Sequence, residues 1–484
     1  MINYLSTRNK NTTATPTMAI LNGLAPDGGL YVPSDLSALK VDYRDVINMD
    51  YRGMARVIFG RFFPDFGEEE IARIVEASYA DKFTAEEITP LVPVGDRYVL
   101  ELFHGPTCAF KDVALSALPN FMVSAARLND FNDEILILTA TSGDTGSAAL
   151  HGFSDVPGTR IIVFYPEHGI SDSQRLQMTT QQGKNTCACA VRGNFDDAQN
   201  GVKRIFTEIP RPAEGVSLSS ANSINIGRLV PQVVYYFAAY AALVKAGRIQ
   251  AGDPVDYTVP TGNFGDIMAG FFAREMGLPV GRLVCASNKN DVLTEFLTTG
   301  HYNRVREFHK TTSPSMDILI SSNLERLLYF VCGPEQTASY MKALSETGEY
   351  TITEGELAKI QSIFTGICAT EEEGASAIGE VFREHGYLLD THTSIAWAAA
   401  EKYQGDSPNV ILSTASPYKF SRAVMTAIGM EPTESDQENM QKLEAGTGIA
   451  APAPLKAIFQ LEVRHKDVIE KDEMMQYVKD RSVR

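Results

Sequence analysis

Lys111 is the side chain in this sequence best placed to act as a nucleophile. It follows Phe110 in a run of small and apolar residues, and a Gly-Pro pair at 105–106 precedes it. Burial beside apolar groups disfavours the charged ammonium, and a neutral lysine amine can form a Schiff base with an aldehyde cofactor. A lysine beside an aromatic ring is more commonly a surface residue, so other parts of the chain must decide between these interpretations.

Two short loops containing glycine are candidates for binding an anion. Thr-Ser-Gly-Asp-Thr-Gly at 141–146 follows the apolar run 134–139, and Thr-Gly-Asn-Phe-Gly-Asp at 261–266 follows the run 255–260. Glycines let a ligand approach the backbone, and the free N–H groups at the start of the next helix face an anion. Because ligands lie beyond the carboxyl ends of parallel strands, both loops are expected to face one crevice. The aspartate in each loop could equally serve as a helix cap.

Other motifs narrow the chemistry. Neither loop has the glycine pattern of a P-loop or of a dinucleotide-binding turn, which disfavours kinase and dehydrogenase interpretations. The eight histidines show no metal-like spacing, so no metal site is expected. His104 and His392 remain of interest without an assigned role. Read alone, Arg228 is a surface charge beside a polar turn, and Thr414 is an ordinary residue at the end of a strand.

Composition bounds the type of protein. The 484 residues are enough for two or three domains, and a net charge of −17 argues against nucleic acid or anionic membranes as main partners. None of the six cysteines forms a Cys-x-x-Cys pair; Cys187 and Cys189 are interpreted as core packing on a strand. We expect a cytoplasmic protein, because there is no disulfide framework, no signal-peptide segment near the N-terminus and no membrane-length apolar run.

The order of apolar segments predicts an α/β architecture. Residues 1 to about 95 read as an opening unit with helical spacing over 51–63 and 68–79. From about 96, strands alternate with helices, which implies parallel sheets with right-handed crossovers. The expected strands are 98–102, 134–139, 160–165, 186–191, 255–260, 282–287 and 409–414. The expected helices include 112–128, a long one over 225–244 interrupted at Pro231, and 267–276.

Two further segments are expected to lie at the periphery. Residues 346–373 are acidic and are predicted to be mostly helical. Residues 432–443 are polar and are predicted to form a mobile connection.

The segment around Lys111 resembles the cofactor-lysine segment of the threonine synthase family, whose members use pyridoxal phosphate (PLP) on the second PLP fold type. The match rests on His-Gly-Pro-Thr at 104–107 and Ala-Phe-Lys-Asp at 109–112. The resemblance extends from 6–8 and 25–30, before this segment, to 452–455 near the C-terminus. After the lysine segment, similar segments occur in the family's order at 141–146, 222–225, 262–266 and 413–420. In the last of these, Ser416 stands where histidine is common in the family, and Tyr418 replaces alanine.

The resemblance implies a fold and a division into domains. It implies two parallel-sheet α/β domains of PLP fold type II with an additional, mainly helical N-terminal domain. The N-terminal domain would span 1–95 and the PLP-dependent region 96–484. Within that region, a smaller α/β subdomain of about 125–220 would be inserted in a larger α/β domain.

The resemblance also implies roles for individual residues. Lys111 would carry PLP and move protons as the catalytic base and acid. The residues expected to contact the cofactor are Lys111, Asp144, Gly262, Asn263, Phe264, Gly265, Asp266 and Thr414, with 262–266 around its phosphate and Thr414 at the pyridine nitrogen. The residues expected to contact the substrate are Ser142 and Thr145, in the loop that grips its carboxylate, and Ser223 and Arg228, at its phosphate.

The implied reaction is the PLP-dependent conversion of O-phospho-L-homoserine and water to L-threonine and phosphate. Two alternatives remain open: a phospho-lyase of the same fold acting on the same substrate, and a non-catalytic protein that senses an amino acid or phosphate. Asn263 and Phe264 in the phosphate loop favour the synthase over the lyase, and an intact Lys111 argues against the sensor. A monomer or homodimer with a small-molecule substrate is expected.

Overall fold

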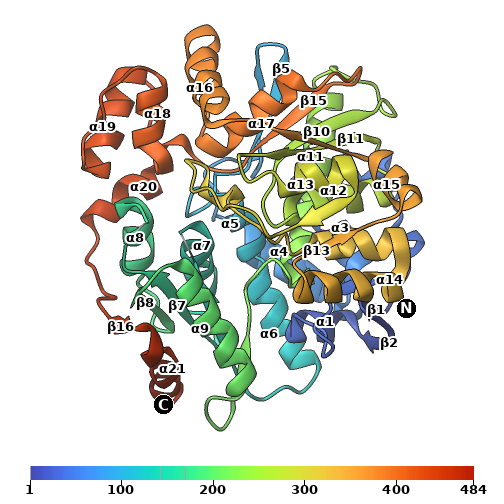
Figure 1. The fold of residues 1–484 in the computed structure, drawn as a ribbon, viewed down its shortest axis with the longest axis vertical. Coiled ribbons are helices and arrows are strands. Elements are labelled where there is room, and N and C mark those ends of the chain that lie inside the picture. The colour runs from blue at the N-terminus through green and yellow to red at the C-terminus, as the bar shows by residue number, and fades with distance from the viewer. Residues whose placement is uncertain (1, 142, 169, 484) are drawn as a thin grey trace.

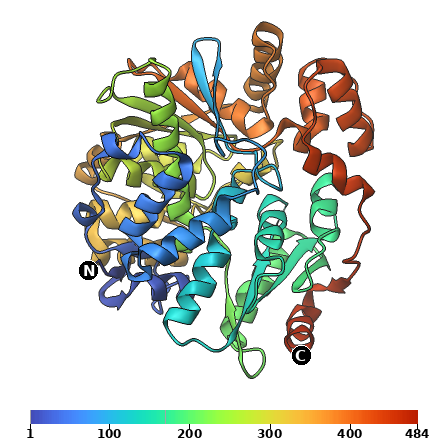
Figure 2. The same ribbon diagram turned by 180° about the vertical axis from the view of Figure 1, so that it is seen from behind.

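The computed structural model describes residues 2–141, 143–168 and 170–483 (Figure 1). The chain begins with an antiparallel sheet in the order β2 (Asn9–Ala14), β1 (Tyr4–Ser6), β3 (Tyr31–Pro33). Helices α1 (Pro16–Asn22), α3 (Tyr51–Phe62) and α4 (Glu68–Tyr79) accompany this sheet, which confirms the helical spacing of the opening unit. Figure 2 shows these helices next to α6 (Leu118–Leu128), which α1 and α4 both contact.

The larger sheet lies in the upper half of Figure 1 and has the strand order β14-β11-β10-β15-β5-β4. Its strands are β4 (Leu91–Val94), β5 (Arg97–Glu101), β10 (Val255–Pro260), β11 (Val280–Ser287), β14 (Phe364–Cys368) and β15 (Asn409–Ser413). All neighbours are parallel except β4, which pairs antiparallel with β5. Every residue of β10 is buried, as expected for a central strand of a parallel sheet covered on both faces by helices.

The smaller sheet is parallel throughout, in the order β16-β8-β7-β6-β9. Its strands are β6 (Glu134–Ala140), β7 (Thr159–Pro166), β8 (Thr186–Arg192), β9 (Val216–Ser219) and β16 (Val468–Glu470). Helices α7 (Asp144–Phe153), α8 (Asp172–Thr179), α9 (Phe195–Glu208) and α21 (Met474–Ser482) cover it. Cys187 and Cys189 are buried in β8, which confirms their role in core packing.

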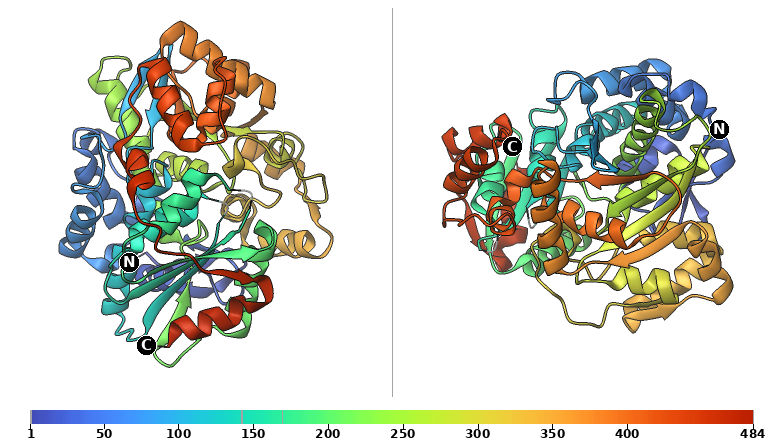
Figure 3. Two further views of the ribbon diagram at one scale, coloured as in Figure 1. Left: turned by 90° about the vertical axis from the view of Figure 1, so that its left-hand side faces the viewer. Right: turned by 90° about the horizontal axis from the view of Figure 1, so that it is seen from above.

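The C-terminal part of the chain runs from the larger sheet to the smaller one. After α17 (Thr391–Lys402) and β15 come α18 (Ser421–Ala427), α19 (Asp436–Thr447) and α20 (Ala453–Ala457), and then β16 and α21. Figure 3 shows this red segment descending beside the five-stranded sheet and ending in α21. The C-terminal strand β16 therefore completes an edge of a sheet whose other strands lie between residues 134 and 219.

Two expectations about peripheral segments were wrong. The segment 432–443, predicted to be a mobile connection, contains most of α19, which begins at the N-cap Ser435 and buries Met440 and Leu443. The segment 346–373, predicted to be mostly helical, contains β13 (Glu349–Thr351) and β14 besides α15 (Glu354–Gln361). Strand β14 is only five residues long, so its alternation is too brief to stand out from charged helical neighbours.

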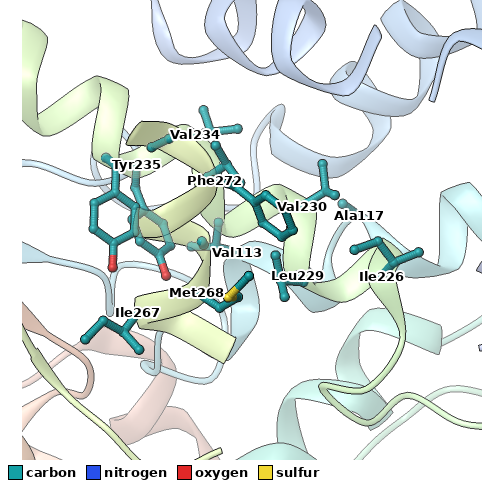
Figure 4. Close-up of a cluster of buried hydrophobic side chains, with 14 of the residues drawn as sticks. Val113, Ala117, Ile226, Leu229, Val230, Val234, Tyr235, Ile267, Met268 and Phe272 are labelled. Carbon is teal, nitrogen blue, oxygen red and sulfur yellow. The ribbon is translucent and has the colours of Figure 1, made fainter. Parts of the chain in front are cut away.

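A buried apolar cluster underlies the loops that follow the strands (Figure 4). It joins α5 (Lys111–Leu115), α10 (Ile226–Leu229), α11 (Val233–Lys245) and α12 (Gly265–Glu275). The helix predicted over 112–128 is broken into α5 and α6 just before Pro119. The predicted interruption at Pro231 is confirmed by the 3-10 turn Val230–Gln232. Within the described ranges, no helix is both long and apolar enough to cross a membrane.

Candidate active site

The sequence candidates come together around one cavity of about 1330 Å³ between the two parallel sheets. Every described candidate lines it: Lys111, Asp144, Thr145, Ser223, Arg228, Gly262, Asn263, Phe264, Gly265, Asp266 and Thr414. Ser142, the remaining candidate, lies outside the described residues. The prediction that both glycine loops face a single crevice is therefore confirmed.

Lys111 is placed by the pairing of its loop with the end of β15. Ala109 forms an antiparallel bridge with Ala415, and the Phe110 N–H donates to the Thr414 carbonyl at 2.8 Å. Asp112 holds the loop 107–112 together, because its carboxylate accepts hydrogen bonds from the backbone N–H (2.8 Å) and the hydroxyl (2.6 Å) of Thr107. These contacts put Lys111 and Thr414 on the wall of the same cavity.

The amine of Lys111 is buried but faces the cavity. The residue is 8% exposed, and its Nζ lies 3.1 Å from Ser315 Oγ and 3.7 Å from Asp144 Oδ2. Burial lowers the pKa of Lys111 to about 8, although the nearby Asp144 carboxylate acts in the opposite direction. A substantial fraction of the amine is therefore neutral and nucleophilic near neutral pH.

Asp144, in the first turn of α7, belongs to a buried ion pair. Its carboxylate lies 2.9 Å from Nζ of Lys419 and accepts a hydrogen bond from Gln174 Nε2 at 3.2 Å. Burial alone would raise the pKa of Asp144, but the positive charges of Lys419 and Lys111 hold it well below its usual range. Asp144 is therefore a permanent anion beside Lys111.

The loop 261–265 has the backbone of a tight anion cradle. Phe264, the N-cap of α12, has φ +61° and ψ 5°, a left-handed conformation that is unusual for a bulky residue. A Cβ on Gly262 would lie 2.3 Å from the Ser315 carbonyl oxygen, so only glycine fits there. The Asn263 carbonyl accepts from both the backbone N–H and Nδ2 of Asn323 at 3.0 Å. Strained backbone held in this way is typical of ligand-binding sites.

Asp266, in the first turn of α12, is held by tyrosine hydroxyls. Tyr235 donates to Asp266 Oδ1 at 2.5 Å and Tyr236 donates to the same oxygen at 3.3 Å. Oδ2 is buried and has no hydrogen-bond partner among the described residues. Burial raises the pKa of Asp266 to about 7, although the two tyrosine hydroxyls act in the opposite direction. Near neutral pH this carboxyl is therefore partly protonated.

Arg228 supplies a second cationic region of the cavity. It is 5% exposed, and its guanidinium donates to the Ala221 carbonyl at 2.7 Å. Burial lowers the pKa of Arg228 to about 10, and within the described part of the chain no neighbouring charge offsets this effect. Because most of its donors have no anionic partner, Arg228 is suited to bind a phosphate that enters the cavity beside Ser223.

Sequence reasoning missed three side chains of the site. Lys419 was quoted within the segment 413–420 but received no role. Ser315 lies in the turn Pro314–Met316, which received no role from the sequence. His392 had been singled out without a role; it lines the cavity from α17. The one signal in the sequence for Lys419 was a lysine in a run of otherwise small and apolar or aromatic residues at 414–421.

Together these groups provide a nucleophilic amine, a fixed carboxylate and two features suited to an anion, the glycine loop before α12 and the guanidinium of Arg228. Such a site can hold an aldehyde cofactor that carries a phosphate, together with a substrate that carries another. It can also move protons at the carbon atoms nearest the amine, because Lys111 titrates close to physiological pH.

Models of known families match nearly the whole chain. The model described as pyridoxal-phosphate dependent enzyme matches residues 83–415, the threonine synthase N terminus matches 3–79, and the threonine synthase C-terminal model matches 393–478.

Individual relatives agree with these models. A threonine synthase of Pseudomonas aeruginosa is 37% identical over 473 residues, which cover 95% of this chain and 94% of the relative. Threonine synthase-like 1 of Homo sapiens is 39% identical over 429 residues and 85% of this chain, which spans 57% of that protein's length.

A solved structure confirms the fold that the sequence indicated. The PLP-bound threonine synthase from Brucella melitensis matches with a TM-score of 0.89 and 37% identity, and the match covers 100% of both chains. The chain belongs to the threonine synthase family of pyridoxal-phosphate dependent enzymes, with the fold of PLP fold type II.

Proposed function

We propose that this chain converts O-phospho-L-homoserine and water to L-threonine and phosphate, with PLP as cofactor. The observation that carries the proposal is the buried Lys111 amine in one cavity that the glycine loop 261–266 and the buried guanidinium of Arg228 also line. A substrate with a phosphate at one end and an amino acid at the other needs both a cofactor site and a second phosphate site.

The residues of the 261–266 loop fit the phosphate of PLP. The start of α12 points free backbone N–H groups at the cavity, and Gly262 leaves no side chain in the way. The unpartnered Oδ2 of Asp266 is a further polar group available to a ligand, and a protonated carboxyl can donate a hydrogen bond to phosphate. Lys111 and Thr414 face the same space, where the aldehyde carbon and the ring nitrogen would lie.

When bound, PLP supplies an electron sink for carbanions next to the substrate α-carbon. The residues of the chain then divide the remaining work. Lys111 is the base and acid that moves protons among the α, β and γ carbons, a role suited to its pKa of about 8. Thr414 offers the ring nitrogen a neutral hydroxyl. Asp144 keeps a fixed negative charge 3.7 Å from Lys111 and so stabilises its ammonium form.

Four polar residues orient the substrate in this proposal. Arg228 and Ser223 bind its phosphate and orient the γ-carbon bond that breaks, while Ser142 and Thr145 bind its carboxylate. The guanidinium fork of Arg228 suits the geometry of phosphate. Water then adds at the β-carbon, which gives the hydroxyl of threonine.

We propose the same organisation and setting that the sequence led us to expect. The N-terminal domain spans 1–95, and a smaller α/β subdomain of about 125–220 lies within a larger one. The six cysteines are free, which supports a reducing, cytoplasmic compartment. The protein would act as a monomer or homodimer.

Product analysis tests the function. Purified protein is incubated with PLP and O-phospho-L-homoserine, and threonine, keto acid and phosphate are measured together. We expect equal amounts of threonine and phosphate, and neither product with Lys111→Ala. Keto acid in place of threonine would assign the chain to the phospho-lyases, and no product with either protein would favour a sensor of amino acids or phosphate.

A further inference from the structure

A turn that lines the cavity brings a hydroxyl to Lys111. This turn, Pro314–Met316, places Ser315 Oγ 3.1 Å from Lys111 Nζ. The two residues lie 204 positions apart in the chain, so the contact is built by the fold and not by local sequence. Asp144, the other polar neighbour of Nζ, lies 3.7 Å away, beyond the usual length of a hydrogen bond.

The turn is fixed at both ends by hydrogen bonds between side chains. Asn288 Nδ2 donates to Ser313 Oγ at 2.8 Å and to Asp317 Oδ1 at 2.8 Å. Asp317 also accepts hydrogen bonds from Asn290 Nδ2 at 2.9 Å and from the Thr311 hydroxyl at 2.7 Å. The carbonyl of Ser315 packs against Gly262, at a point where any side chain would collide with it.

His392 holds Ser315 itself. The Ser315 backbone N–H donates to His392 Nε2 at 3.2 Å, so Nε2 must be an unprotonated acceptor. The proton is then on Nδ1, which donates to Asp390 Oδ1 at 3.0 Å. Asp390 is the N-cap of α17 and is fully buried, and His392 is 2% exposed. This arrangement fixes the tautomer of His392 and the orientation of its ring.

We propose that Ser315 is a further catalytic residue, whose hydroxyl holds the free Lys111 amine between proton transfers, and that His392 and Asp390 are positioning residues for it. The proposal rests on the proposed function, because it concerns the lysine that moves the protons. The proposal gives a chemical role to the turn Pro314–Met316 and to His392.

The hydroxyl can serve both protonation states of the lysine. It accepts a hydrogen bond from the ammonium, and after a rotation it donates one to the neutral amine. No proton passes to Ser315 in either state; the proton that Lys111 gives up goes to the substrate carbon. Hydrogen bonds to a charged donor are the stronger ones, so Ser315 favours the ammonium over the amine. Nζ keeps one position while its charge changes.

The test measures the titration of Lys111 in the cofactor-free protein by competitive acetylation across a pH series, followed by peptide mass spectrometry. Ser315→Ala should lower the apparent pKa of Lys111 by about one unit, because the buried ammonium loses its acceptor. Ser315→Thr, which keeps the hydroxyl, should restore it. The charged groups that face Lys111 are unchanged in these variants: Asp112, Asp144, Arg228, Asp266 and Lys419.

Ser313→Ala is the matched control. The hydroxyl of Ser313, the N-cap residue of the turn, bonds Asn288 and not Lys111, and the bond from Asn288 to Asp317 still holds the turn in this variant. Its removal should leave the pKa of Lys111 within a few tenths of a unit of the unsubstituted value. An equal shift in Ser313→Ala and Ser315→Ala would mean that the turn acts only structurally and would overturn the proposal. An unchanged pKa in Ser315→Ala would also overturn it.

Two substitutions of His392 test the positioning. His392→Gln keeps an acceptor within reach of the Ser315 N–H and should preserve the pKa of Lys111, whereas His392→Phe should lower it as Ser315→Ala does. Equal pKa values of Lys111 in the two variants would show that His392 does not position Ser315. Because this readout needs neither cofactor nor turnover, a normal pKa response in a protein that makes no threonine would count against the proposed function and not against the role of Ser315.

Discussion

The two glycine loops of this molecule look alike in sequence but create opposite electrostatic environments. Each follows a buried parallel strand, and each puts an aspartate in the first turn of the next helix. Asp144 has Lys419 at 2.9 Å and a pKa held well below its usual range. Among the described residues, the hydrogen-bond partners of the Asp266 carboxylate are tyrosine hydroxyls alone, and burial raises its pKa to about 7.

The difference shows that the partner of a buried carboxyl, more than its place in a motif, determines its charge. A permanent anion at Asp144 can balance the ammonium groups of Lys111 and Lys419. A carboxyl that takes up a proton can lie at Asp266 beside an incoming phosphate without repelling it. The surroundings of Asp144 are thus suited to a cationic lysine, and those of Asp266 to an anionic cofactor.

The largest effect should come from removing the charge of Asp144. Asp144→Asn leaves Lys419 buried without its counter-ion, which should lower the free energy of unfolding by about 3–5 kcal/mol. Asp266→Asn keeps an acceptor for both tyrosines and should change it by less than about 1 kcal/mol at pH 7. Urea unfolding of the cofactor-free proteins at pH 7 measures both values.

The double variant Asp144→Asn, Lys419→Met is the control for this comparison. It removes both charges and should recover much of the lost stability, because no unpaired charge remains. If the two single variants lose equal stability, the contrast between the loops is not electrostatic.

The next effect distinguishes two glycines of the 261–266 loop. A methyl group at Gly262 would lie 2.3 Å from the Ser315 carbonyl oxygen, whereas the nearest atom to one at Gly265 would be Asn323 Nδ2 at 3.4 Å. Gly262→Ala should therefore weaken PLP binding by about 1–3 kcal/mol, and Gly265→Ala by clearly less. Fluorescence titration with PLP provides the comparison. Equal losses of PLP affinity in the two variants would show that the close contact between Gly262 and the Ser315 carbonyl does not determine the conformation of the loop.

Arg228 tests whether the cavity has a separate end for the substrate. Arg228→Lys keeps the charge but loses the guanidinium fork, so binding of O-phospho-L-homoserine should weaken by about 2 kcal/mol while PLP affinity stays near its original value. Spectral titration of the PLP-loaded protein follows substrate binding. Unchanged affinity for both molecules would make Arg228 a structural residue only.

The smallest effect concerns pH. Asp266 is charged above its pKa of about 7, and a bound phosphate raises that pKa further, so PLP binding takes up a proton there. Relative to Asp266→Asn, the affinity of the original protein for PLP should fall by up to about tenfold per pH unit above pH 7. PLP titrations of both proteins at several pH values give the ratio of their affinities. Lys111 titrates in both proteins, so its contribution cancels in this ratio. A ratio independent of pH would contradict the protonation of Asp266.

Local sequence patterns account for the elements that carry the site. The strand 255–260 and the loop after it lie where the sequence predicted them, because a short run rich in β-branched and aromatic residues, followed by Thr-Gly-Asn, is typical of a strand that ends in a turn. Lys111 was found through its segment, and the cavity confirmed that the chemically interesting residues share one space. Pro231 marked the interruption of its helix correctly, since proline cannot continue the backbone hydrogen bonds.

The contacts that set the charges could not be predicted, because they join distant parts of the chain. Lys419 bonds Gln177 across 242 positions and Thr107 across 312, and Ser315 reaches Lys111 from another distant turn. No periodic pattern in the sequence indicates which of these distant side chains will meet. The helix at 436–447 was missed for a different reason: its polar surface resembles a linker, and only a few buried residues such as Leu443 hold it against its neighbours.

The central claim is that this cavity breaks the bond between the γ-carbon and the phosphate oxygen and adds water at the β-carbon. Turnover of O-phospho-L-homoserine in water enriched in oxygen-18, followed by mass spectrometry of both products, tests it directly. The account predicts one oxygen-18 in the side-chain hydroxyl of threonine and none in the phosphate released. Oxygen-18 in the phosphate, with homoserine as the other product, would show cleavage of the phosphorus–oxygen bond and would contradict the account.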